Sequence, residues 1–193
     1  VDLHAPDVLA QVRHWVTDRG ARGIRLFLQI DPDDSWLRGP ACDPVLDELE
    51  ALGAVALAAV TTPQIPALAE VVRRHPGLSF VLDHCAYPDL SGGPDYPNAR
   101  GLFALAAEPN IDVKVSSLVL HMARDAGADP AAFATAIVRT WGAERVMWAS
   151  DRTVHPEPYA SLIAEAEHAF AALTDDERRW VFGACAARRW FGT

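Results

Sequence analysis

An aspartate and a histidine stand side by side at the end of a short apolar run, in the segment "FVLDHCAYPDL". The letters "FVL" are typical of a buried β-strand, an environment that a chain normally keeps free of ionisable groups. The strand nevertheless delivers Asp83 and His84. Burial perturbs the pKa values of carboxyl and imidazole groups, so the pair indicates acid/base chemistry or metal binding at this point of the chain.

Polar residues also follow the other apolar runs that we expect to be strands. In a parallel α/β architecture the carboxyl ends of the strands meet at one rim, where binding sites form. Each residue taken alone has a structural explanation, such as a helix cap or a surface ion pair. Their coincidence at the ends of several strands favours a functional site. In chain order the set comprises Gln29 and Asp31, Thr61 and Thr62, Asp83 and His84, Lys114 and Ser116, and Ser150, Asp151, Arg152 and His155.

The elements that must position this rim follow from the hydrophobic pattern. Short apolar runs alternate with segments of helical periodicity, which predicts an α/β fold with a parallel sheet covered by helices. We expect the strands to be adjacent in chain order, with right-handed helical crossovers. Residues 118–127 are expected to be rich in loops. The predicted strands are 24–30, 54–60, 79–83, 111–116 and 145–150, and the predicted helices are 7–19, 43–52, 62–72, 99–107, 129–141, 159–173 and 174–190.

Length and composition limit the class of protein. A chain of 193 residues, half of them hydrophobic, fits one domain spanning residues 1–193. The net charge of -9 opposes nucleic-acid binding. The three cysteines are far apart and indicate buried thiols rather than disulfides or a thiolate zinc site. No apolar stretch is long enough to span a membrane and no secretion signal opens the chain, so we expect a cytoplasmic protein.

Several segments together are similar to one family. "GIRLFL" resembles a Gly-Ile/Val-Arg strand, "FVLDHCAYPD" a Val-Asp-His-x-Gly-x-Pro-Asp segment, and "NIDVKVSSL" an Asn-Val-x-x-Lys-x-Ser-Gly strand. "ERVMWASDRTVHP" and "ERRWVFGACAARRWF" resemble the last strand and the closing helix of the same family. This is the amidohydrolase-related (amidohydrolase 2) family, in the lactonase-like branch that includes the 2-pyrone-4,6-dicarboxylate lactonases. The resemblance runs from about residue 20 to the end.

The resemblance implies a (β/α)8 barrel of the TIM type and roles for individual residues. Asp151 would be the general base that activates water, while His84 would polarise the substrate carbonyl or bind a metal. Arg25 would contact a substrate carboxylate. Further substrate contacts are expected from Tyr87, Lys114, Ser116 and His155.

The resemblance also implies which way two neighbouring side chains point. Successive strand residues face opposite sides of a sheet. If His84 faces the barrel interior, Asp83 is expected to lie buried under the helices or to fix a loop, and in either case to serve stability. His84 and Asp151 are expected to converge at the same rim, close enough to share a water or a metal ion.

The sequence lacks several features of the family, and their absence leads to further expectations. It contains no His-x-His motif, and only the last five βα units of a barrel can be counted. We therefore expect a partial barrel that lacks about three units of ~30 residues each, and an in-frame upstream stretch with His-x-His would make the chain a fragment of an ordinary barrel. Its open sheet edges predict a homo-oligomer. Tyr87 stands where the dicarboxylate lactonases carry an Arg, which disfavours a doubly anionic substrate.

The same departures set the expectation for metal. His84 and Asp151 are the only candidate ligands, fewer than a divalent ion generally needs, so the metal site stays unknown and no tightly bound cofactor is expected. Zinc or manganese would become possible if the His-x-His motif were supplied.

The expected function is that of a hydrolase that opens a lactone or similar cyclic ester with an Asp-activated water. Its substrate would be a small molecule, such as a carboxylated lactone or an amide. Two alternatives stay open. One is a metal-dependent decarboxylase or amidase of the same family, and the other is a non-catalytic truncated barrel that acts as an assembly or binding module.

Overall fold

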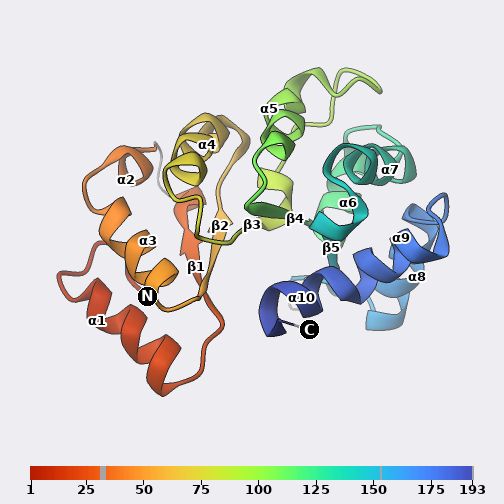
Figure 1. Ribbon diagram of the computed structural model, residues 1–193. Coiled ribbons are helices and arrows are strands. Elements are labelled where there is room, and N and C mark those ends of the chain that lie inside the picture. The colour runs from red at the N-terminus through yellow and green to blue at the C-terminus, as the bar shows by residue number, and fades with distance from the viewer. Residues whose placement is uncertain (31–33, 153, 193) are drawn as a thin grey trace.

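Five parallel strands, adjacent in chain order, form the centre of the molecule (Figure 1). The computed structural model describes residues 1–30, 34–152 and 154–192. The prediction of a parallel sheet with sequential strand order is confirmed. Four strands agree with the predicted ranges to within one residue, while β1 ends at Phe27 because Leu28–Ile30 turns into a 3-10 helix. The strands are β1 (Gly23–Phe27), β2 (Val55–Ala59), β3 (Phe80–Leu82), β4 (Ile111–Ser116) and β5 (Val146–Ala149).

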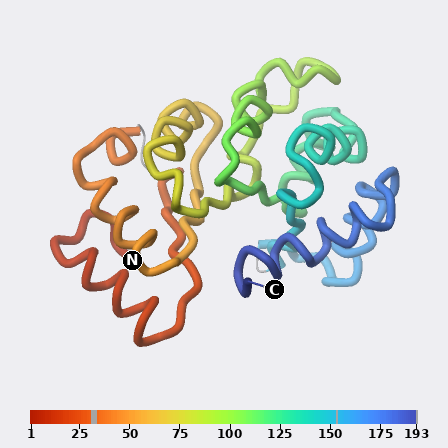
Figure 2. The backbone as a smooth tube through the Cα atoms, in the orientation of Figure 1, coloured from red at the N-terminus to blue at the C-terminus, as the bar shows by residue number. Residues whose placement is uncertain are grey.

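Helices follow the strands and lie in an arc around the sheet (Figure 2). Several begin at the caps that the sequence provides: Asp129 accepts a hydrogen bond from the N–H of Ala131, and Thr174 and Glu177 form a capping box. The helices are α1 (Val8–Arg13), α2 (Ser35–Arg38), α3 (Cys42–Ala51), α4 (Ile65–Arg74), α5 (Arg100–Ala104), α6 (Ser117–Asp125), α7 (Pro130–Trp141), α8 (Tyr159–Ala169), α9 (Asp175–Arg179) and α10 (Cys185–Phe191), with π-helical turns at His14–Asp18 and Trp180–Ala184. Among the residues described, no helix is long and apolar enough to cross a bilayer.

The expectation of a loop-rich stretch at 118–127 is wrong. Residues 117–125 form α6, which begins directly at the end of β4 without an intervening loop. Its buried residues Val119, Leu120 and Ala123 recur at helical spacing, and this stripe packs into the core. The partly buried His121 and the polar Arg124 and Asp125 interrupt the apolar pattern and obscured the period.

The two faces of the sheet have different partners. Residues such as Phe80 and Val113 point outward and pack with the helices in the main core. The inner face carries Val55, Val81 and Met147, which pack with Cys185 and other residues of the C-terminal helical segment. This segment therefore lies against the inner face of the sheet, in the opening of the arc (Figure 2).

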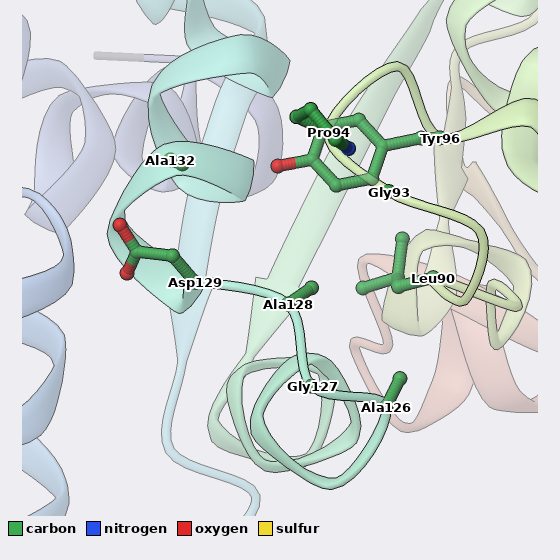
Figure 3. Close-up of a pocket in the computed structure, with 9 residues that line it drawn as sticks. All are labelled: Leu90, Gly93, Pro94, Tyr96, Ala126, Gly127, Ala128, Asp129 and Ala132. Carbon is green, nitrogen blue, oxygen red and sulfur yellow. The ribbon is translucent and has the colours of Figure 1, made fainter.

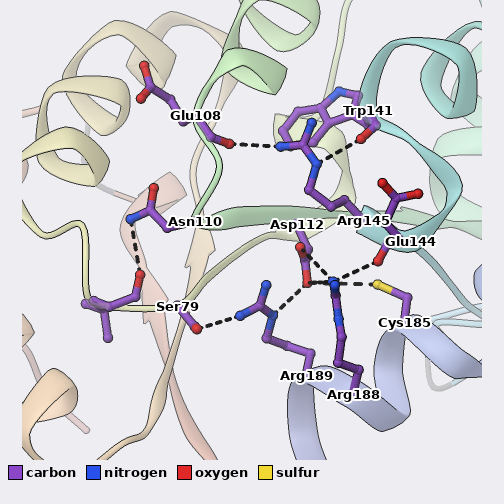
Figure 4. A network of polar contacts seen from close by, with 11 residues as sticks. Ser79, Glu108, Asn110, Asp112, Trp141, Glu144, Arg145, Cys185, Arg188 and Arg189 are labelled. Carbon is purple, nitrogen blue, oxygen red and sulfur yellow. Dashed lines mark hydrogen bonds and ion pairs between the residues drawn. The ribbon is translucent and has the colours of Figure 1, made fainter. Parts of the chain in front are cut away.

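A buried carboxylate fastens α10 to that inner face (Figure 4). Asp112 on β4 is fully buried and accepts a hydrogen bond of 2.6 Å from Nε of Arg189. The guanidinium of Arg188 lies 3.5 Å from the same carboxylate and also donates to the carbonyl oxygen of Glu144. Arg189 in addition donates to the hydroxyl of Ser79, just before β3. Two cations thus compensate the desolvation of one buried anion.

Candidate active site

The strands deliver a cluster of charged side chains to the rim at their carboxyl ends. Because Leu82 pairs with Val113 across β3 and β4, the next residues, Asp83 and Lys114, are neighbours. Nζ of Lys114 lies 2.8 Å from Oδ1 of Asp83, and a terminal nitrogen of Arg25 lies 2.6 Å from Oδ2 of the same carboxylate. Asp83 therefore joins cations from β1 and β4.

The expectation that Asp83 lies under the helices is wrong. The strand ends at Leu82, and Val81 faces the inner side, so alternation places Asp83 on the inner side as well. His84 is no longer in the strand, because its φ of 48° begins a left-handed turn that brings its ring back to the same rim. The alternation starting from Val81 was the signal that could have identified Asp83 as a site residue.

His84 lies at the centre of the cluster. Its Nδ1 atom is 2.8 Å from Oγ of Ser116 and 3.8 Å from Oδ2 of Asp151. Its Nε2 atom is 3.5 Å from Oδ2 of Asp83 and 3.5 Å from a guanidinium nitrogen of Arg25. The predicted convergence of His84 and Asp151 is confirmed. Burial lowers the pKa of His84, an effect that Asp83 and Asp151 only partly oppose, so the imidazole is neutral at neutral pH.

A run of left-handed residues shapes this part of the rim. His84, Cys85, Ala86 and Tyr87 all have positive φ angles, between 48° and 59°, and Asp151 has a φ of 50°. Each such non-glycine residue costs on the order of 1–2 kcal/mol. The turn is held by a hydrogen bond from the N–H of Tyr87 to the carbonyl oxygen of His84. Apart from Tyr96, the described non-glycine residues with positive φ are thus the two predicted to do chemistry and those that connect His84 to Tyr87.

Tyr87 extends the cluster toward β1. Its ring lies 5.2 Å from the ring of His84, and its hydroxyl accepts a hydrogen bond of 2.9 Å from Nε2 of Gln29. Burial raises the pKa of Tyr87, so the phenol stays protonated and can donate to a ligand. Gln29 follows β1 and belongs to the polar strand-end residues, but its role as the partner of Tyr87 has no signature in the sequence.

The sequence is similar to known proteins over most of its length. The model of the amidohydrolase family matches residues 1–192. The chain belongs to the amidohydrolase family. It is 33% identical over 194 residues to L-fucono-1,5-lactonase of Burkholderia ambifaria, a match that covers 95% of this chain and 66% of that protein. The chain thus spans just under two thirds of the length of this curated relative.

Solved structures agree with this assignment. An amidohydrolase of Burkholderia multivorans with bound zinc superimposes with a TM-score of 0.80 at 25% identity, over 98% of this chain and 71% of that one. The 5-carboxyvanillate decarboxylase of Sphingomonas paucimobilis, at 18% identity, shares the fold with a TM-score of 0.62 over 94% of this chain and 62% of that one. The predicted α/β fold of the (β/α)8 type, represented by five strands, is confirmed.

His155 occupies a different position from the other predicted site residues of this amidohydrolase. It is buried, its ring packs edge-on at 4.7 Å against the ring of His121, and its Nδ1 atom lies 3.9 Å from Glu157. Within the described part of the chain, no hydrogen bond or ion pair joins His155 to His84 or Asp151. Its predicted substrate contact stays a prediction. Asp31, another of the strand-end residues, lies outside the described residues.

The residues at the rim do not by themselves fit a divalent metal ion. In residues 1–30, 34–152 and 154–192, no group of three or more His, Cys, Asp or Glu side chains is arranged to hold one. The Nε2 atom of His84 has the guanidinium of Arg25 at 3.5 Å, where a metal ion would meet a positive charge. The groups that the rim itself offers for chemistry are therefore side chains.

A cavity of about 200 Å³ lies away from this cluster (Figure 3). It is formed by the loop after β3 and by the connection between α6 and α7, and its lining includes Leu90, Tyr96 and Asp129. The predicted site residues do not line it. The rim at the carboxyl ends of the strands, rather than this cavity, carries the histidine and the carboxylate that the sequence predicts to do the chemistry.

Proposed function

We propose that this amidohydrolase opens a lactone ring by hydrolysis, with Asp151 as the general base. The observation that carries the proposal is the convergence of Asp151, His84 and Ser116: Nδ1 of a neutral imidazole lies 2.8 Å from the hydroxyl of Ser116 and 3.8 Å from the carboxylate of Asp151. A carboxylate within reach of a water molecule and beside polar hydrogen-bonding groups is the arrangement that general-base hydrolysis requires.

The reaction consists of two proton transfers around one tetrahedral intermediate. Asp151 takes a proton from water as the water oxygen attacks the lactone carbonyl carbon. The carbonyl oxygen becomes an oxyanion, and N–H groups of the cations Arg25 and Lys114 stabilise its charge. The ring C–O bond then breaks, and Asp151 returns the proton to the leaving alkoxide. The product is a hydroxy acid, and the enzyme is restored.

The charges at the rim favour a neutral substrate. Arg25 and Lys114 are balanced by Asp83 and Asp151, while His84 is neutral. A dicarboxylate would bring two uncompensated negative charges to this balanced cluster. The hydroxyl groups of a sugar lactone, in contrast, match donors such as the phenol of Tyr87. The 33% identity to L-fucono-1,5-lactonase supports a hydroxylated sugar 1,5-lactone as the substrate class.

The test is a hydrolysis assay of the purified protein. We expect proton release, followed with a pH indicator, from neutral sugar 1,5-lactones and little from dicarboxylated pyrones. The variant Asp151→Asn keeps the shape of the side chain and should lose at least 1000-fold in kcat with an unchanged melting temperature. Turnover of Asp151→Asn near the wild-type rate, or carbon dioxide release from aromatic carboxylates without lactone hydrolysis, would contradict the proposal. A folded protein without either activity would favour the non-catalytic module.

A further inference from the structure

Asp83 contacts three side chains of the rim, although the proposed hydrolysis gives it no step of its own. Only 2% of its side chain is exposed, yet it is within 2.8 Å of Lys114, within 2.6 Å of Arg25 and within 3.5 Å of His84. These groups come from different strands or from the turn after β3. One carboxylate therefore holds together the side chains that would surround the substrate carbonyl.

The sheet is built so that Arg25 can reach this carboxylate. Arg25 lies on β1, and β2 separates it from β3. On the inner face of β2, the register pairs Ala59 with Phe27 on one side and places it beside Asp83 on the other, because Ala58 pairs with Leu82. Arg25 itself pairs with Leu57, two residues before Ala59 on the same face of β2. Ala59 has a small side chain, and a terminal nitrogen of Arg25 reaches to 2.6 Å from Oδ2 of Asp83.

The two cations keep hydrogen-bonding capacity beyond Asp83. An ammonium and a guanidinium each carry several N–H donors, and the contacts with Asp83 engage only part of them. In the described part of the chain, Asp83 is the acid within ion-pair distance of Lys114. Side chains as long as those of Lys and Arg have many rotamers, so a fixed buried anion is needed to hold their donors in one place.

We propose that Asp83 is a positioning residue for lactone hydrolysis, which fixes the ammonium of Lys114 and the guanidinium of Arg25 where they meet the developing oxyanion. This inference rests on the proposed function. Asp83 itself neither touches the substrate nor transfers a proton. Its effect is exerted through the two cations and through the orientation of His84.

The experiment compares Asp83→Asn with a matched control. Asp83→Asn should lower kcat about 100-fold, the effect of losing an oriented oxyanion donor, with a much smaller change in KM. Asp112→Asn is the control. Asp112 is a buried carboxylate of the same sheet, away from the rim, and it also has two cationic partners, which lie on α10. This variant should lower the melting temperature but leave kcat of the folded protein unchanged. A purely structural Asp83 would behave like Asp112.

A double-mutant cycle separates positioning from independent effects. Lys114→Met should also lower kcat, and Asp83→Asn combined with Lys114→Met should lose little more than either alone, because both remove the same interaction. If the fold-losses in kcat of the two single variants multiply in the double variant, the proposal is overturned. Should Asp83→Asn fail to fold, Lys114→Met and Arg25→Met still test it, since kcat at the wild-type level in both would contradict the role of the held cations.

A titration of His84 by NMR gives a readout that needs no turnover. Asp83 raises the pKa of His84, against the lowering effects of burial, Lys114 and Arg25. His84 should therefore titrate at a lower pH in Asp83→Asn than in the wild type. If no lactone is hydrolysed but this shift is observed, the proposed function fails while the placement of Asp83 at His84 holds. If the wild type is active and Asp83→Asn shows neither the shift nor the loss of kcat, the positioning role is wrong.

Discussion

Nδ1 of His84 lies 2.8 Å from Oγ of Ser116, and both residues are buried. The serine belongs to β4, a rigid element, whereas the histidine sits in a strained turn after β3. The hydrogen bond therefore fixes a ring on a strained turn to a strand. With Nδ1 bonded to Ser116, the Nε2 atom of the ring is the one directed to Arg25 and Asp83.

We expect Ser116→Ala to lower kcat about tenfold and to destabilise the fold by about 1–3 kcal/mol, because it leaves a buried ring nitrogen without its partner. Steady-state kinetics and thermal unfolding would measure the two effects. Ser117→Ala is the matched control, since the hydroxyl of Ser117 is buried without a hydrogen-bond partner among the described residues. Equal effects of the two variants would show that the contact with His84 has no special importance.

The stability of the protein should decrease on acidification below the ordinary His pKa. Burial lowers the pKa of His84 in the folded state, so the unfolded chain binds a proton first as the pH falls below about 6.5. The contribution of His84 is complete above that pH and is lost toward the lower pKa of the folded protein. Urea unfolding at pH 5 to 8 would show a steeper decline for the wild type than for His84→Gln. The same decline in both proteins would assign the effect to other groups.

Ala86→Gly should leave the free energy of unfolding within about 0.5 kcal/mol of the wild type. Glycine relieves the positive φ of 59°, and this gain offsets the loss of a buried methyl group. Ala123→Gly, at a buried position of α6, has no strain to relieve and should cost at least about 1 kcal/mol. Chemical denaturation would compare them. A larger loss for Ala86→Gly than for Ala123→Gly would argue against strain in the turn.

Gly23→Ala should be strongly destabilising, by about 1–3 kcal/mol or more. A Cβ atom at this position would lie 2.5 Å from the carbonyl oxygen of Val55 and 2.9 Å from the ring of Trp190. Gly183→Ala is the control, because a Cβ atom there has no neighbour within 4 Å. Its melting temperature should equal or exceed that of the wild type. A neutral Gly23→Ala variant would contradict the close approach of Val55 and Trp190 to Gly23.

The sequence was informative where local rules apply. The apolar runs predicted the strands, and the position of His84 and Asp151 after two of them predicted their convergence, because parallel strands end at one rim. The expected self-association and the role of His155 stay predictions.

Three features depend on information that is not local. The left-handed turn at His84–Tyr87 contains no glycine that would mark it in the sequence. The in-and-out alternation of strand residues was therefore applied to His84 as well, and this placed Asp83 on the wrong side of the sheet. The start of α6 directly at the end of β4 removed the loop that normally separates two elements. The packing of α10 on the inner face depends on contacts with Asp112, far away in the chain.

That distance in the chain has a consequence for how the protein is made. Arg189 contacts Ser79 across 110 residues, and the inner face of the sheet at Val55, Val81 and Met147 is covered by residues translated after all five strands. While α10 is still inside the ribosome, these apolar side chains have no cover. Folding of this face therefore finishes only after synthesis of the strands is complete, and the nascent chain exposes an apolar surface during that interval.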